Sequence, residues 1–292
     1  MAKLVVIGSG VVGQATGKGF IAKGHEVVFC DINPETLAKL EKQGYKVCTA
    51  DLLEQKTNVE AFFLAISTPT VDGRIQLGFL EGAIAHLGDV LKRQNGYCIV
   101  VVRSTIPPNT TVGSLVPLLE KYSGKKAGHD FGVCMNPEYL REHRNEEDFK
   151  NPWIITVGEL DAKSGETLEK IYGSCNCPIV HTSIEEAEIQ KYIHNLFNAC
   201  KISFFNEMRM ICKAVKVDAD KVFELVVKSA EAQWNPQYGI RDFGAYSGSC
   251  LPKDTTAFLA WAKEELAKSM PLLNAVIKTN EIVKNRYNNN GA

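Results

Sequence analysis

The chain has 292 residues, of which 45% are hydrophobic and 23% charged, and its formal net charge is −1. This length predicts two domains, and the composition is that of an ordinary soluble globular protein. A net charge near zero gives no overall attraction for nucleic acid or an anionic membrane, so any phosphate-binding site must be local.

Neither an export signal nor a membrane span is predicted. Glycines interrupt the apolar start of the chain, and no apolar run approaches the ~20 residues that a spanning helix needs. Nine cysteines, an odd and scattered number, fit reduced thiols better than a disulfide framework. Cys175-Asn176-Cys177 has no second Cys/His pair at ligand spacing, so we expect no metal site. Because neither an export signal nor a membrane span is predicted, we expect a cytoplasmic protein.

A glycine-rich turn follows the first predicted strand, residues 3–7. The turn is Gly8-Ser9-Gly10-Val11-Val12-Gly13, it opens a helical pattern, and Asp31 closes the next predicted strand. This is the dinucleotide-binding arrangement, in which glycines allow close backbone approach and N–H groups at the helix start bind a pyrophosphate. Asp31 would bind ribose hydroxyls and repel a 2′-phosphate, which favours NAD over NADP. A strand–helix turn without a cofactor is the alternative.

Three further predicted strands, 61–66, 97–102 and 132–135, end in polar loops. The loops contain Ser67-Thr68-Pro69-Thr70, Arg103-Ser104-Thr105, and residues 136–142 with Glu138. Parallel strands end at one edge of a sheet, where α/β proteins bind ligands, so we expect Thr68, Thr105 and Glu138 to share a crevice. Ordinary capping is the alternative for each. With last strands near 153–158 and 178–181, the pattern predicts a Rossmann-like, doubly wound parallel sheet.

Long helices follow from about Ser183, and we predict a first domain of residues 1–183 and a helical domain of residues 184–292. The expected helices cover residues 185–215, 219–229 and 255–287, with a break or kink near Met270-Pro271. Lys191 and Asn195 are four positions apart, so they lie on one helix face and can point at one oxygen. A solvated lysine and a tolerated asparagine are the alternative. His194 lies off that face and is interpreted as structural.

An aromatic loop and a cysteine motif lie late in the chain. The loop, residues 234–246, contains Tyr238, Arg241 and Tyr246, and either stacks on a base and pairs a phosphate or merely packs. In Gly248-Ser249-Cys250-Leu251-Pro252-Lys253-Asp254, Pro252 favours a helix start. The helix dipole and Lys253 would then favour a Cys250 thiolate, and Asp254 could orient water or hold Lys253. A buried structural cysteine is the alternative.

These motifs, in this order, resemble the UDP-glucose/GDP-mannose dehydrogenase family across essentially the whole chain. The resemblance implies NAD-dependent oxidation of a nucleotide-sugar primary alcohol to a carboxylate in two hydride transfers, with UDP-glucose as the default substrate. It also implies a homodimer formed through the helical domain. Cys250 would carry a thiohemiacetal and then a thioester, and Lys191 with Asn195 would stabilise the oxyanion.

The resemblance assigns roles to further residues. Thr105, Glu138 and Asp254 are expected around the base and the hydrolytic water. The expected cofactor-binding residues are Gly8, Gly10, Val11, Val12, Gly13, Asp31, Ser67, Thr68, Pro69, Thr105, Glu142 and Lys253. The expected substrate-binding residues are Glu138, Tyr139, Leu140, Arg141, Glu142, Lys191, Asn195, Tyr238, Arg241, Tyr246 and Gly248.

Three departures from the family pattern bear on substrate choice. Ser247-Gly248 stands where the family has paired glycines, and His143 stands where it commonly has glycine. Family members also carry a third domain, which is expected to be missing here, either because this is a fragment or because the native protein is short. A two-electron β-hydroxyacid dehydrogenase using Lys191 and Asn195, and a silent NAD-binding or assembly module, are the alternative functions.

Overall fold

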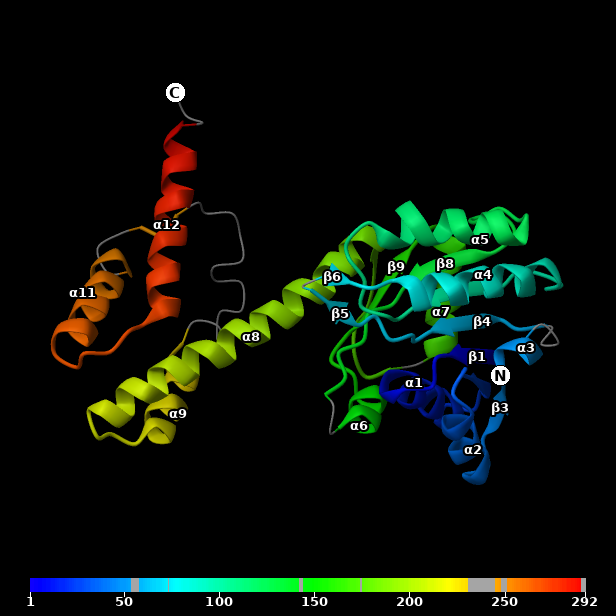
Figure 1. The fold of residues 1–292 in the computed structure, drawn as a ribbon, viewed down its shortest axis with the longest axis horizontal. Helices are drawn as coiled ribbons and strands as arrows, with labels where there is room; N and C mark the ends of the chain where they lie inside the picture. The colour runs from blue at the N-terminus through cyan, green and yellow to red at the C-terminus, as the bar shows by residue number, and fades with distance from the viewer. Residues whose placement is uncertain are drawn as a thin grey trace. The chain divides into compact units, whose positions relative to one another are not determined.

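A computed structural model describes residues 1–53, 58–72, 74–141, 144–173, 175–230, 245–247 and 251–289. Within these ranges it describes the side chains of all residues except 202, 253, 254, 257, 261 and 286–289. The chain divides into two compact units, Met1–His194 and Asn195–Ala292 (Figure 1).

The first unit is built on an eight-stranded sheet with the strand order β10-β9-β8-β7-β4-β1-β2-β3. The strands are β1 (Lys3–Ile7), β2 (Glu26–Cys30), β3 (Lys46–Cys48), β4 (Ala61–Leu64), β7 (Ile99–Val102), β8 (Gly132–Met135), β9 (Ile155–Glu159) and β10 (Ile179–Ser183). The neighbouring strands β8, β7, β4, β1, β2 and β3 all run parallel to one another, which confirms the predicted Rossmann-like class.

The last two strands refine that prediction. β9 pairs antiparallel with β8, and β10 runs parallel with β9, so both run opposite to the rest of the sheet. The connection from β8 to β9 contains a short helix, α6 (Asn145–Lys150), which packs on the first helix of the chain. An antiparallel neighbour needs no crossover helix packed along the sheet, and α6 is the one helix among the described residues of this connection.

Helices cover both faces of the sheet. They are α1 (Val11–Ala22), α2 (Pro34–Lys42), α3 (Ala50–Leu53), α4 (Gly78–Lys92), the π-helical turn η1 (Thr111–Leu115), α5 (Val116–Ser123) and α7 (Ala162–Tyr172). Alternate strand residues face opposite sides. Val5 and Phe62 accordingly join a core with α4 and α5, whereas Val6 and Phe63 join a core with α1 and α7.

A small hairpin was not predicted from the sequence. Strands β5 (Thr70–Val71) and β6 (Arg74–Ile75) pair antiparallel, and the Gln76 N–H donates to the Pro69 carbonyl at 2.8 Å to close its base. Two residues per strand carry no detectable alternation of apolar and polar side chains, so the sequence pattern could not indicate it.

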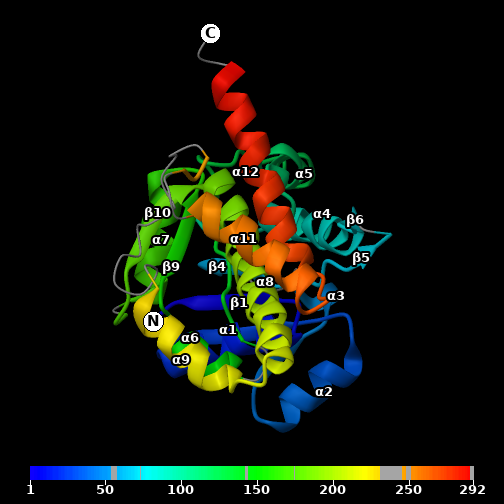
Figure 2. The ribbon, with the colours of Figure 1, turned by 90° about the vertical axis from the view of Figure 1, so that its left-hand side faces the viewer.

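The remaining helices match the predicted positions. They are α8 (Ile184–Ala214), which begins in the first unit, α9 (Ala219–Ser229), α11 (Leu251–Glu264) and α12 (Pro271–Asn289). The predicted break at Met270-Pro271 separates α11 from α12, and these two helices lie side by side (Figure 2). The buried Glu207 carboxylate accepts the Leu272 and Leu273 N–H groups at 3.0 and 3.3 Å and so caps the start of α12. Across the described ranges, every helix is too short or too polar to cross a membrane.

Candidate active site

The glycine turn after β1 uses its three glycines differently. Gly8 has a φ of +90°, and a Cβ on it would lie 2.4 Å from the Ala65 carbonyl oxygen. A Cβ on Gly13 would lie 1.8 Å from the Gly8 oxygen, whereas a Cβ on Gly10 would meet nothing within 4 Å. Gly8 and Gly13 are therefore required by the turn and its packing. Gly10 borders open space, which a side chain at this position would occupy. With glycine there, a ligand has room to approach the backbone of the turn.

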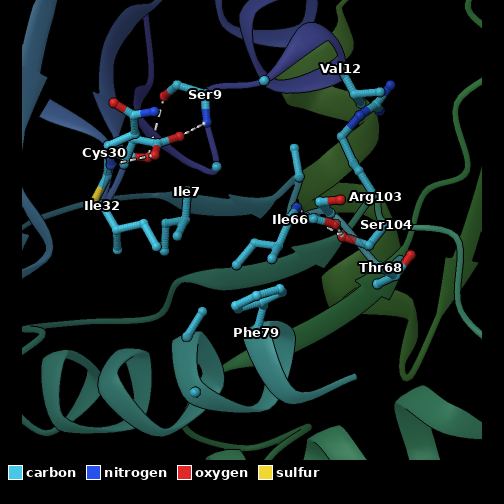
Figure 3. A pocket seen from close by; sticks show the side chains of 18 of the residues that line it. Ile7, Ser9, Val12, Cys30, Ile32, Ile66, Thr68, Phe79, Arg103 and Ser104 are labelled. Carbon is cyan, nitrogen blue, oxygen red and sulfur yellow. Dashed lines mark hydrogen bonds between the residues drawn. The ribbon is translucent and has the colours of Figure 1, made fainter. Parts of the chain in front are cut away.

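A cavity of about 850 Å³ opens beside this turn (Figure 3). Its lining includes the predicted site residues Gly8, Gly10, Val11, Val12, Asp31, Ser67, Thr68, Thr105 and Glu138. Gly13 and Pro69 are not in the lining; Gly13 is buried against Gly8, and Pro69 lies at the base of the β5–β6 hairpin. The structure thus gathers most of the predicted residues of the sheet edge around one cavity.

Asp31, at the end of β2, is held in place by backbone donors. Its carboxylate accepts the Ser9 N–H at 2.6 Å and the Asn33 N–H at 2.8 Å. At the start of α1, no side chain caps the helix, so its first N–H groups remain available for an anion. An open glycine, an uncapped helix start and an oriented carboxylate are the groups that a dinucleotide needs, and the site therefore fits NAD.

The loops that follow β4 and β7 are bound to each other. The Ser104 hydroxyl donates to the Ile66 carbonyl at 2.7 Å and accepts the Ile66 N–H at 2.9 Å. The Thr68 hydroxyl donates to the Thr105 carbonyl at 2.7 Å. Because these bonds join neighbouring strand ends, they fix Thr68 and Thr105 at the same edge of the sheet. Ser104 was not predicted as a site residue, although it directly precedes Thr105.

A buried ion pair joins the loop after β8 to helix α8. Lys191 Nζ lies 3.0 Å from Glu138 Oε1 and also donates to the Glu138 carbonyl oxygen, and the two side chains are only 7% and 14% exposed. The other carboxylate oxygen accepts the Leu140 N–H at 2.7 Å. Such a pair places a proton acceptor and a fixed cation at one point, next to the cavity that Glu138 lines.

Two rings border this ion pair. The Tyr139 ring centroid lies 5.5 Å from Lys191 Nζ, and its hydroxyl bonds Thr156 at 2.9 Å and also Gln190. Burial raises the pKa of Tyr139. His194 lies with its ring centroid 4.8 Å from that of Tyr139, and burial, followed by the Lys191 charge, lowers its pKa. Both rings are therefore held in their neutral forms beside the ammonium.

A buried network under the site was missed from the sequence. Arg103 lines the cavity, donates to Asn136 and donates to the Tyr172 hydroxyl at 2.8 Å, and that hydroxyl donates to Asn136 at 2.6 Å. Arg103 directly follows the all-apolar strand β7, and this position could have indicated from the sequence that the arginine is buried near the site. Further lining residues that were not predicted include Ile32, Asn33, Phe79 and His86. Figure 3 shows Phe79 of α4 facing the cavity opposite Ile7 and Ile66.

Several predicted residues are not part of this cavity. Arg141 forms an ion pair with Asp148, with 2.6 Å between Nη2 and Oδ1. Asn195 is exposed on α8 and does not line the cavity. Tyr246 exchanges two hydrogen bonds with Asn280 of α12, with donor–acceptor distances of 2.7 and 3.1 Å. The predicted residues Glu142, Tyr238, Arg241, Gly248 and Cys250 lie outside the described residues, as do the side chains of Lys253 and Asp254.

Two domains of one known protein family together match nearly the whole chain. The NAD binding domain of the UDP-glucose/GDP-mannose dehydrogenase family matches residues 2–176, and the central domain of the same family matches residues 185–282. A GDP-mannose 6-dehydrogenase of Pseudomonas syringae pv. tomato is 34% identical over 298 residues, which cover 95% of this chain and 68% of the relative. A UDP-glucose 6-dehydrogenase of Haloferax volcanii is 35% identical over 305 residues, 96% of this chain and 69% of the relative.

Solved structures agree with these sequence matches. A ternary complex of GDP-mannose dehydrogenase from Pseudomonas aeruginosa aligns with a TM-score of 0.89 at 31% identity, over 96% of this chain and 68% of that one. A UDP-glucose dehydrogenase from Pyrobaculum islandicum aligns with a TM-score of 0.69 at 33% identity, over 97% and 68% of the two chains. The chain therefore belongs to the UDP-glucose/GDP-mannose dehydrogenase family and is an NAD-dependent oxidoreductase, as its sequence motifs predicted.

Proposed function

We propose that the protein oxidises the primary alcohol of a nucleotide sugar to a carboxylate in two successive hydride transfers to NAD. The observation that carries the proposal is the buried Lys191–Glu138 pair at the edge of the cofactor cavity. A GDP-mannose 6-dehydrogenase and a UDP-glucose 6-dehydrogenase are about equally identical in sequence to this chain, at 34% and 35%. GDP-mannose and UDP-glucose are therefore the first substrates to test. UDP-glucose remains the default.

In the first oxidation, the substrate hydroxyl loses its proton as the carbon loses a hydride. NAD, when bound, accepts the hydride. Lys191 supplies a fixed positive charge for the oxygen that becomes an alkoxide, and Asn195, one turn further along α8, supplies a second donor. Glu138 holds the Lys191 ammonium and is one candidate acceptor for the proton, directly or through water. Thr105 and Asp254 are the other polar residues proposed around the base.

In the second oxidation, Cys250 captures the aldehyde. The residue directly precedes Leu251, at which α11 begins, and a helix start favours the thiolate. The sulfur adds to the aldehyde carbon, and the oxygen takes up a proton to give a thiohemiacetal. Loss of that proton and of a second hydride gives a thioester. The oxygen again becomes negative during each step, so the same Lys191 charge serves throughout.

Water then hydrolyses the thioester. The water oxygen attacks the carbonyl carbon, the carbon–sulfur bond breaks, and the thiol of Cys250 is regenerated. The balanced reaction consumes one alcohol, two NAD and one water, and releases one carboxylate, two NADH and three protons. The predicted positions of Glu138 and Asp254 near the reacting carbon would let one of them activate this water.

The direct test combines a substrate panel with a nucleophile variant. The protein is incubated with NAD and with GDP-mannose, UDP-glucose and related nucleotide sugars, and NADH formation and carboxylate product are measured. We expect turnover with one of these sugars. Cys250→Ser should stall at the aldehyde or its adduct, and the control Cys200→Ser, an exposed cysteine in α8, should keep full turnover. Full activity of Cys250→Ser with a hydroxyacid substrate would support the two-electron alternative, and silence across the panel despite NAD binding would support the silent module.

We also propose that the helical unit forms a homodimer in the cytoplasm. Phe197 and Leu225 are 63% and 66% exposed, and no residue of α9 is buried, so apolar side chains remain uncovered in a single chain. A second copy would cover them, and an odd number of scattered cysteines fits a reducing compartment. Leu225→Glu should convert the dimer to a monomer in light scattering, and a wild-type protein that is monomeric at micromolar concentration would contradict the assembly.

A further inference from the structure

Two half-buried cysteines lie on the connection between α7 and β10. Cys175 and Cys177 are partly exposed, in contrast to the buried Cys98 and Cys134 of the sheet core. Only Asn176 separates the two cysteines, and the Cys175 thiol donates to the Tyr172 carbonyl oxygen at 3.7 Å. The backbone bends at residues 176 and 177 instead of continuing as a helix or strand, so the ladder of β10 does not hold the two cysteines on opposite faces of the sheet. Neither residue belongs to the site described above.

A lysine distinguishes one sulfur from the other. Lys23, the residue that follows α1, places its Nζ 3.4 Å from Cys175 Sγ and 3.0 Å from the Tyr172 carbonyl oxygen. The Lys23 ammonium is therefore placed to stabilise the negative charge that the Cys175 sulfur carries when it attacks an oxidant. Burial, with the neighbouring Cys175 as the next cause, raises the pKa of Cys177 and keeps that residue a thiol. One cysteine is thus arranged as the attacked sulfur and the other as the resolving thiol.

We propose that Cys175 and Cys177 form a peroxide-sensitive dithiol that closes to an intramolecular disulfide. The Cys175 sulfur, as its thiolate, attacks hydrogen peroxide and the peroxide O–O bond breaks, which gives a sulfenic acid and hydroxide; the hydroxide takes up the proton that the thiol had lost and leaves as water. Cys177 then attacks the Cys175 sulfur, the sulfur–oxygen bond breaks, and a second water leaves with the thiol proton. The two cysteines lose two electrons in total, and one peroxide gains them. A cellular dithiol reductant would reverse the reaction.

Peptide mapping tests the proposal without any measurement of activity. The whole protein is exposed to a small excess of hydrogen peroxide, its thiols are alkylated, and it is digested with trypsin. The tryptic peptide of residues 171–191 contains both cysteines and no other, and the peptide of residues 192–201 contains Cys200 alone. We expect the first peptide to escape alkylation and to lose two hydrogens, about 2 Da, until dithiothreitol restores it. The exposed Cys200 should remain alkylated over the same time.

Three variants test the order of the steps. Cys177→Ser should accumulate a sulfenic acid on Cys175 that dimedone labels, whereas Cys175→Ser should leave Cys177 unlabelled. Lys23→Met should slow disulfide closure several-fold, and the control Lys42→Met, at the end of α2, should leave the rate unchanged. Alkylation of both cysteines after peroxide treatment, a disulfide to Cys200 instead, or equal labelling of the two single variants would overturn the proposal.

Discussion

The two units of the chain differ in how completely they bury their apolar side chains. In the first unit, β1, β4, β7 and β8 are buried almost throughout, and core clusters lie on both faces of the sheet. In the second unit, the described core is a cluster of Ile211, Ala262 and Met270, and α9 buries no residue. The first unit therefore has an extensive core and the cofactor cavity, whereas the described part of the second unit exposes apolar side chains that the proposed dimer would cover.

The largest expected difference comes from aromatic truncation in each unit. Phe20 is fully buried, and its ring centroid lies within 5.2 Å of those of Phe63, Phe149 and Tyr172. Phe20→Ala should therefore lower the free energy of unfolding by about 3–5 kcal/mol at every protein concentration. Phe197→Ala, at a 63% exposed position, should act only through the dimer, so its effect should disappear on dilution. Denaturant unfolding at several concentrations measures both, and equal, concentration-independent losses would break the comparison.

The glycine turn offers a second contrast, within the first unit. Gly13→Ala should destabilise the protein by roughly 1–3 kcal/mol, because its Cβ would overlap the Gly8 oxygen. Gly10→Ala should leave the melting temperature nearly unchanged and weaken NAD binding, because its Cβ enters the open space of the cradle. Calorimetric unfolding and NAD titration separate the two effects. Unchanged NAD affinity in Gly10→Ala would show that the dinucleotide does not approach this turn.

Helix N-caps should contribute equally to the unfolding free energy of both units, because we expect the units to differ only in how they bury apolar side chains. Asp161 accepts the Ser164 N–H at the start of α7, and Asp218 accepts the Asp220 N–H at the start of α9, each at 3.0 Å. Replacing either aspartate by alanine should cost about 1 kcal/mol of unfolding free energy. The measurement is chemical denaturation followed by circular dichroism. A loss at Asp161 several times the loss at Asp218 would mean that the two units differ in more than packing.

The smallest expected effect is a pH dependence at the edge of the sheet. His181 lies 2.6 Å from Glu159 and 3.1 Å from Glu169, and the hydrogen bond to Glu159, more than that to Glu169, raises its pKa. A raised pKa means that protonation stabilises the fold; the contribution is complete below the ordinary value of about 6.5 and is lost as the pH rises through the raised pKa. His181→Gln should flatten the fall in melting temperature over this range, and the exposed control His129→Gln should not. An unchanged slope in His181→Gln would remove His181 as its source.

Motifs with a fixed local geometry were the predictable part of the site. Gly10 and Asp31 could be placed because a dinucleotide turn constrains both their spacing and their roles. Thr68, Thr105 and Glu138 could be brought together because parallel strands end at one edge of a sheet.

Contacts between distant segments were not predictable. The sequence indicated Lys191 and Glu138 as site residues, but their direct pairing depends on where α8 enters the first unit. The Arg103–Asn136–Tyr172 network joins two strand ends to a helix far along the chain, so no local pattern reveals it. The reversed direction of β9 and β10 has the same origin, because strand pairing is decided by packing and not by the residues of the strand alone.

The most direct test of the proposed chemistry is the number of NADH molecules formed per substrate molecule consumed. A limiting amount of the accepted nucleotide sugar is oxidised to completion with excess NAD, and NADH absorbance is compared with the carboxylate formed. We predict two NADH per carboxylate and no free aldehyde. One NADH for each substrate molecule, with an aldehyde or ketone as the final product, would contradict the account.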